Sequence, residues 1–107
     1  MGSEMCIRDR LIDRSKINNI KVGNINEDFD TVNDADWIVE AVVERIDIKH
    51  DIYSKIFKNR KDGAIVSSNT SSIPIKVLSE KLTDNEKKDF CITHFFNPVR
   101  YLSLIHI

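Results

Sequence analysis

The chain has 107 residues, a formal net charge of -1 at pH 7, and 41% hydrophobic and 31% charged residues. This length allows one small domain or a part of one, and the balanced charge gives no electrostatic case for binding nucleic acid. The sequence has no apolar run long enough to span a bilayer, and its first residues lack the apolar centre of a signal peptide. These features predict a globular protein of the cytoplasm that binds neither nucleic acid nor membranes.

The chain contains two cysteines, Cys6 and Cys91, which lie far apart. Their spacing fits no common set of metal ligands, so we expect buried or incidental thiols in a reducing compartment and no metal site. The first ten residues, MGSEMCIRDR, carry charge without hydrophobic periodicity. No secondary structure is predicted for them.

The predicted elements begin with two short segments. IKV at residues 20–22, followed by a Gly-Asn turn signal, is typical of a short strand. Residues 27–33 are acidic and predict one helical turn whose inward side chains are Phe29 and Val32.

Residues 37–43, WIVEAVV, give a strong strand signal. The run is nearly continuous in apolar and β-branched residues, which is typical of a strand covered on both faces, as parallel strands are. Glu40 lies inside this run, and a buried carboxylate needs a partner. We therefore expect Glu40 to have a structural role.

Residues 46–59 predict an amphipathic helix. Ile48, Ile52 and Ile56 recur at a spacing of four, which places them on one side of the helix. Gly63 then suits the left-handed position that follows a last helical turn. The side expected to face water consists of Lys49, Asp51, Lys55 and Lys58.

A second strand is predicted at residues 64–66. It passes into a polar turn and then a helix that we expect to open at Ser71 or Ser72, to hold Pro74 in its first turn and to end near Leu82. Ligands bind at such junctions in α/β proteins, because several strand ends and a helix start share one crevice. A capped junction that binds nothing is the commoner interpretation of the turn alone.

The last predicted strand is FCITHFF at residues 90–96, after a charged connection at residues 83–89. It ends at Asn97-Pro98, because proline cannot donate a hydrogen bond to a neighbouring strand. The alternation of strands and helices predicts parallel pairing with right-handed crossovers. The expected fold class is therefore α/β, with part of a doubly wound parallel sheet.

Polar residues follow each of the three predicted parallel strands. They are Glu44 after the first strand, residues 69–72 after the second, and His94 with Asn97 at the third. Histidine can take and return a proton near neutral pH, and an asparagine side chain can bind an amide group. Each residue alone has a structural interpretation, as a core histidine, a solvated carboxylate or a turn cap. Their occurrence at three strand ends together indicates a ligand site.

Three blocks of the sequence resemble the NAD-binding domain of 3-hydroxyacyl-CoA dehydrogenases. They are residues 35–56 (ADWIVEAVVERIDIKHDIYSKI), residues 63–75 (GAIVSSNTSSIPI) and residues 93–101 (THFFNPVRY). The resemblance spans about residues 22–101. The last block and the charged segment before it are most similar to the long enzymes that are fused to an enoyl-CoA hydratase unit.

The resemblance implies roles for individual residues and NAD as the cofactor. Glu44 and Lys49 match residues that contact NAD, and Ser71 matches a serine between nicotinamide and substrate that would bind the 3-oxygen of the substrate. His94 matches the catalytic histidine that takes the proton of the 3-hydroxyl group. Asn97 matches an asparagine near both nicotinamide and substrate, so the implied catalytic set is His94, Ser71 and Asn97.

The sequence also departs from the family pattern. Its glycines, Gly2, Gly23 and Gly63, cannot form the G-x-G-x-x-G loop that binds the pyrophosphate. The glutamate that would orient the catalytic histidine is replaced by His106. We therefore expect an incomplete Rossmann-like doubly wound parallel sheet, the second half of the NAD-binding domain, at residues 17–102. The segments at residues 1–15 and 103–107 look foreign to it.

These features support three hypotheses. The first is a fragment of an NAD-dependent 3-hydroxyacyl-CoA dehydrogenase of fatty-acid β-oxidation, inactive by itself, whose parent dimerises through an all-α domain that we expect outside this sequence. The second is a related dehydrogenase of small 3-hydroxy acids. The third is a non-catalytic relative that binds a nucleotide or CoA or has a structural role.

Overall fold

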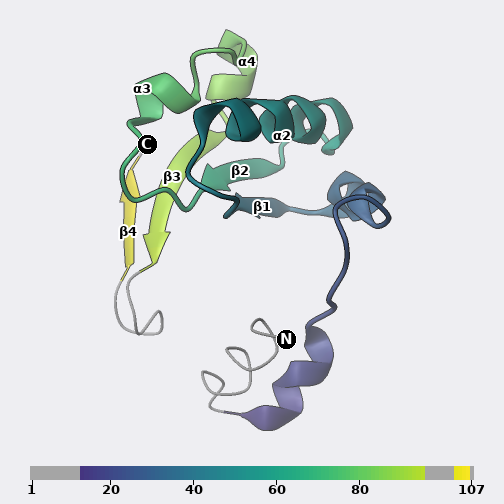
Figure 1. Cartoon of the computed structure of the whole chain (residues 1–107). Coiled ribbons are helices and arrows are strands. Elements are labelled where there is room, and N and C mark those ends of the chain that lie inside the picture. The colour runs from purple at the N-terminus through teal and green to yellow at the C-terminus, as the bar shows by residue number, and fades with distance from the viewer. Residues whose placement is uncertain (1–12, 96–102, 107) are drawn as a thin grey trace.

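The computed structural model describes residues 13–95 and 103–106 (Figure 1). Two short 3-10 helices come first, and a four-stranded sheet with three α-helices follows. No helix in the described part of the chain is both long and apolar enough to cross a membrane. The elements are η1 (Arg14–Asn19), η2 (Phe29–Asp34), β1 (Trp37–Glu40), α2 (Ile46–Asn59), β2 (Ile65–Ser68), α3 (Ile75–Leu78), α4 (Asp84–Lys87), β3 (Phe90–Phe95) and β4 (Ser103–His106).

The strands lie in the order β1-β2-β3-β4, and the first three are parallel. Glu40 pairs with Ser68 and Ser68 pairs with Ile92, so the carboxyl ends of β1, β2 and β3 meet at one edge of the sheet. The parallel α/β order predicted from the alternating pattern is confirmed. β4 was not predicted, and it runs antiparallel to β3.

The core lies between α2 and the sheet. Tyr53 packs edge-on against Phe90, with the ring centroids 5.2 Å apart. Phe29 and Val32 of η2 pack against the same cluster, as the acidic helical turn predicted. Burial of this apolar surface is the main force that holds the helices on the sheet. The buried cluster consists of Tyr53, Ile56, Val66, Leu78, Phe90 and Ile92.

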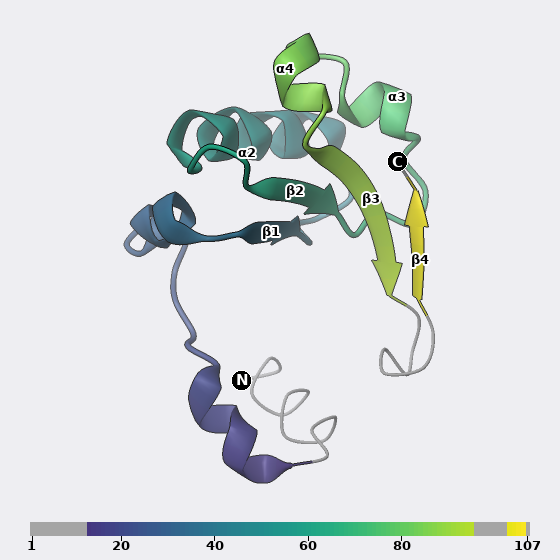
Figure 2. The same ribbon diagram turned by 180° about the vertical axis from the view of Figure 1, so that it is seen from behind.

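One face of the sheet has no helix over it in the described structure. α2, α3 and α4 all lie on the opposite face (Figures 1 and 2). Side chains along β1 therefore alternate, with Trp37 51% and Val39 41% exposed, while Ile38 is half-buried and Glu40 is buried. The prediction that this strand is covered on both faces is wrong for the described residues, since helices cover only one.

The predicted strand at residues 20–22 is also wrong. Those residues have no regular structure, and Val22 is 69% exposed. β1 pairs only with β2, so the described chain offers this segment no strand partner for its backbone groups. Before it, η1 begins at Arg14, where Asp13 caps the backbone N–H of Ser15.

The turn after β2 differs from its prediction. α3 begins at Ile75, with Pro74 as the residue before it, and it ends at Leu78 rather than near Leu82. The hydroxyl groups of Thr70 and Ser72 donate to Glu44, and the described turn opens no helix at Ser71 or Ser72.

The charged segment that follows contains a helix that was not predicted. α4 begins after Thr83, whose side chain accepts from the backbone N–H of Glu86 while Glu86 accepts from that of Thr83. This reciprocal pair is a capping box, which satisfies two free N–H groups at a helix start. The motif TDNE at residues 83–86 could have revealed it in the sequence.

Candidate functional site

A hollow of about 290 Å³ lies beside the carboxyl ends of β2 and β3. Ser71, from the turn after β2, and His94, near the end of β3, both line it. The predicted convergence of the serine-rich turn and the histidine is therefore present in the structure. The other lining residues are Thr70, Ser72, Ile73, Pro74 and Ile92.

Glu44 joins this turn from the loop after β1. Its Oε2 atom accepts hydrogen bonds from Thr70 Oγ1 at 2.7 Å and from Ser72 Oγ at 2.9 Å. The bond from Thr70, followed by the bonds from Ser72 and Lys49 and the charge of Lys49, lowers the pKa of Glu44 to about 2 against the effect of partial burial. Glu44 is thus an ionised carboxylate at neutral pH. Its side chain remains 39% exposed.

Lys49 is buried, so its predicted position on the water-facing side of the helix is wrong. Its side chain is 1% exposed, and Nζ lies 2.7 Å from Glu40 Oε2 and 3.1 Å from Glu44 Oε1. Lys49, Tyr53 and Ile56 are the buried residues of α2 and face the sheet. A lysine occurs on this side because the buried carboxylate of Glu40 needs a positive charge. Its contact with NAD stays a prediction.

Glu40 has the structural partners that its sequence position required. Oε1 accepts from Ser68 Oγ at 2.8 Å and from the hydroxyl of Tyr53. Oε2 accepts from the backbone N–H of Val42 at 2.9 Å and from Lys49. Burial, the bond to Glu40 and its charge raise the pKa of Tyr53 far above its usual value, which keeps the phenol protonated.

Sequence reasoning missed the link from Glu40 to the predicted site. The signal was an acidic residue inside an apolar strand, followed nine residues later by a lysine on the next helix. Neither residue alone predicts the pair, because the two lie on different elements.

His94 is half-buried, and the chain after it is tied to the same turn. The backbone N–H of Phe95 donates to Asn69 Oδ1 at 3.4 Å. Asn97, the remaining predicted site residue, lies outside the described residues. In the backbone register of β3 and β4, His94 is opposite Leu104 and Ile92 is opposite His106.

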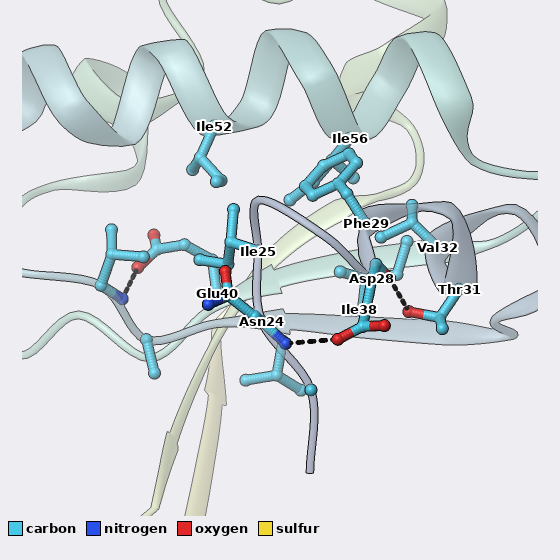
Figure 3. A pocket seen from close by; sticks show the side chains of 14 residues that line it. Asn24, Ile25, Asp28, Phe29, Thr31, Val32, Ile38, Glu40, Ile52 and Ile56 are labelled. Atoms are coloured by element: carbon cyan, nitrogen blue, oxygen red, sulfur yellow. Dashed lines mark hydrogen bonds between the residues drawn. The ribbon is translucent and has the colours of Figure 1, made fainter. Parts of the chain in front are cut away.

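A second hollow, of about 420 Å³, lies between η2, β1 and α2 (Figure 3). Asp28 holds the loop on one side, where it accepts from the backbone N–H of Asn24 at 2.8 Å. Ile38, Ile52 and Phe29 give this hollow an apolar lining. Glu40 is among its lining residues, whereas Ser71 and His94 line the smaller hollow.

No group of three histidine, cysteine, aspartate or glutamate side chains in the described residues is arranged to hold a metal ion. The polar groups around the smaller hollow are instead hydroxyls, an imidazole and an anchored carboxylate. Such groups can hydrogen-bond a polar organic ligand and transfer a proton.

Comparison with known proteins identifies the family. The family described as "3-hydroxyacyl-CoA dehydrogenase, NAD binding domain" matches residues 3–107. A protein of Rickettsia felis, whose name refers to a trifunctional enzyme of a fatty acid oxidation complex, is 47% identical over 92 residues, which is 86% of this chain and 13% of that protein. A Bacillus subtilis protein, whose name refers to a 3-hydroxyacyl-CoA dehydrogenase, is 46% identical over 82% of this chain and 11% of its own length.

A solved structure agrees with these relatives. The dehydrogenase part of multifunctional enzyme 1 from C. elegans superposes with a TM-score of 0.76 at 31% identity, over 96% of this chain and 24% of that chain. The match confirms the expected Rossmann-like α/β class. This chain therefore belongs to the 3-hydroxyacyl-CoA dehydrogenase family and corresponds to its NAD-binding domain.

Proposed function

We propose that this chain supplies the nicotinamide end of the active site in an NAD-dependent 3-hydroxyacyl-CoA dehydrogenase of fatty-acid β-oxidation. The observation that carries the proposal is that Ser71 and His94 line one hollow, beside a turn anchored on Glu44. The names of the relatives support this activity, although the chain spans only 13% of the Rickettsia felis protein.

The residues around the hollow fit part of NAD. The ionised carboxylate of Glu44 and the hydroxyl of Ser71 suit the ribose hydroxyls and the carboxamide of the nicotinamide nucleoside. Lys49 and Asn97 complete the set that the family resemblance assigns. A hollow of about 290 Å³ is sized for this end of the cofactor rather than for the whole dinucleotide. When bound, NAD accepts the hydride from C3 of the substrate.

In this proposal His94 is the general base and Ser71 orients the substrate. The imidazole of His94 takes the proton of the 3-hydroxyl group as C3 becomes a carbonyl carbon, and it returns the proton in the reverse reaction. The hydroxyl of Ser71 donates a hydrogen bond to the 3-oxygen and holds it near the imidazole. Asn97 would contact nicotinamide and substrate.

A chimeric enzyme tests the activity. In this chimera the part of the chain that matches the Rickettsia felis relative over 92 residues replaces the corresponding segment of that relative. The unmodified relative serves as the reference. We expect NADH to form with a 3-hydroxyacyl-CoA and not with the corresponding free 3-hydroxy acid. Turnover of the free acid alone would favour a dehydrogenase of small acids. NAD binding without turnover would favour a non-catalytic relative.

The isolated chain should neither bind NAD tightly nor turn over substrate. Its 107 residues contain no G-x-G-x-x-G sequence to supply backbone N–H groups to the pyrophosphate. The parent should be a dimer that assembles through an all-α domain. Micromolar binding of NAD to the isolated chain in calorimetry would contradict the first of these expectations.

A further inference from the structure

Three charged side chains form a continuous line from the core to the turn that borders the hollow. Glu40 is 3% exposed, Lys49 is 1% exposed, and Glu44 reaches solvent. The ammonium of Lys49 lies between the two carboxylates, at 2.7 Å from Glu40 and 3.1 Å from Glu44. Lys49 also donates to the backbone oxygen of Val42 at 3.3 Å. Its position is therefore set by these three groups.

The line continues into the turn that carries Ser71. Thr70 and Ser72, the two neighbours of Ser71, both donate to Glu44. Thr70 Oγ1 also accepts from the backbone N–H of Ile73 at 3.1 Å, so Glu44 and this backbone group share one hydroxyl. The placement of Ser71 thus depends on where Glu44 is held.

Glu40 is the buried end of this row of three charges, and it is not part of the wall of the hollow at the strand ends. Within the described part of the chain its carboxylate accepts hydrogen bonds from Ser68, Tyr53, Val42 N–H and Lys49. A buried carboxylate with four donors is strongly fixed in place. A fixed anion in turn fixes the ammonium that it pairs with.

We propose that Glu40 is a positioning residue of the dehydrogenase site, which acts through Lys49 and Glu44 to hold the turn that carries Ser71. The kinetic part of this inference depends on the proposed function, whereas the structural part concerns the chain itself.

Glu40→Gln isolates the contact with Lys49. The amide oxygen of glutamine can still accept from Ser68 and Tyr53, whereas its NH2 group takes the place of Oε2 and faces the donors Lys49 and Val42 N. Asp89→Asn is the matched control, because it removes the charge of another ion pair, with Arg60 at 2.8 Å, near the amino ends of β2 and β3.

A double-mutant cycle in the chimeric enzyme tests whether Glu40 acts through Lys49. Glu40→Gln should raise KM for NAD or lower kcat by about tenfold or more, while Asp89→Asn changes neither. In a Lys49→Met background the same substitution should add less than twofold, because the group through which it acts is already absent. Equal effects in both backgrounds would overturn the proposal. Since Glu40→Gln with Lys49→Met removes both buried charges, its stability relative to Lys49→Met shows whether an unpaired buried charge is the cause if that single variant folds poorly.

Amide hydrogen exchange in the isolated chain decides the structural part. Glu40→Gln should speed exchange of the Ile73 N–H more than that of Ile56, which lies within α2 and reports global opening. The effect should vanish in the Lys49→Met background. Equal acceleration at Ile73 and Ile56 would show a purely structural role and overturn the proposal. A chimera that forms no NADH would refute the proposed function and leave this second measurement to decide on Glu40.

Discussion

Thr70 Oγ1 donates a 2.7 Å hydrogen bond to Oε2 of Glu44, and this bond ties the turn after β2 to the loop after β1. The two segments are 26 residues apart in the chain. The same hydroxyl accepts from the backbone N–H of Ile73, and α3 begins only at Ile75, after Pro74 in an extended conformation. The bond from Thr70 is the largest cause of the low pKa of Glu44.

Removal of that hydroxyl should raise the pKa of Glu44. In the parent chain Glu44 titrates at about 2, below its ordinary value of 4.5, so its contribution to stability is present above pH 4.5 and is lost as the pH falls towards 2. In Thr70→Val, Glu44 should therefore titrate at a higher pH. The free energy of unfolding of this variant should fall less between pH 4.5 and pH 2. Carbon-13 NMR of the carboxyl groups and urea unfolding at several pH values measure the two effects.

Thr31→Val is the matched control for this prediction. The Thr31 hydroxyl donates to the backbone oxygen of Asp28 at 2.9 Å, away from Glu44. The pKa of Glu44 should not change in this variant. If Glu44 still titrated at about 2 in Thr70→Val, the assignment of Thr70 as its main partner would be wrong.

Loss of the buried ammonium should destabilise the chain strongly. Lys49→Met leaves the carboxylate of Glu40 buried without a cation, which costs about 3–5 kcal/mol in comparable buried pairs. Arg45→Met removes an ion pair of similar length, 2.9 Å to Asp47, whose side chains are 64% and 62% exposed. Such exposed pairs contribute about 0–1 kcal/mol. Urea unfolding compares the two variants, and equal losses of stability would contradict the structural role of Lys49.

Substitution of Gly63 by a residue with a Cβ atom should destabilise the chain because of the backbone conformation at this position, and not because of a steric clash. Its φ angle is +82°, and a Cβ added there would have no neighbour within 4 Å. Gly63→Ala should therefore lower the free energy of unfolding by about 1–2 kcal/mol. Gly63→Asn should lose less, because asparagine tolerates the left-handed region better. An alanine variant as stable as the parent would be inconsistent with this backbone conformation.

Features that depend on neighbouring residues in the sequence were predictable. The bounds of α2 agree with the predicted residues 46–59. Gly63 is left-handed as expected, but it lies in the turn before β2 and not at the end of α2, whose C-cap is Arg60 in an extended conformation. Both follow from local periodicity and from the steric freedom of glycine. The parallel order of β1, β2 and β3 followed from the alternation of strands and helices.

Features that depend on contacts between distant segments were not predictable in this way. Lys49 occupies a position that periodicity assigned to water, because its partner Glu40 lies on another element. The bond from Thr70 to Glu44 joins segments 26 residues apart, so no local pattern indicated it. Ser71 and His94 line one hollow, as predicted, because parallel strands bring their carboxyl ends to one edge of the sheet.

The catalytic assignment depends most on His94, and the chain offers a second histidine as a control. His94 lines the hollow with Ser71, whereas Nε2 of His50 on α2 contacts the backbone oxygen of Val77 at 3.0 Å. Both histidines can be replaced by glutamine, which keeps hydrogen-bonding capacity but cannot act as a general base near neutral pH.

The most direct measurement is the rate of NADH formation by the chimeric enzyme with a 3-hydroxyacyl-CoA. His94→Gln should lower kcat by about two to four orders of magnitude, the contribution of a positioned general base, while NAD affinity changes little. His50→Gln should leave the rate unchanged. An unchanged rate in His94→Gln would contradict the account that the imidazole beside Ser71 transfers the proton.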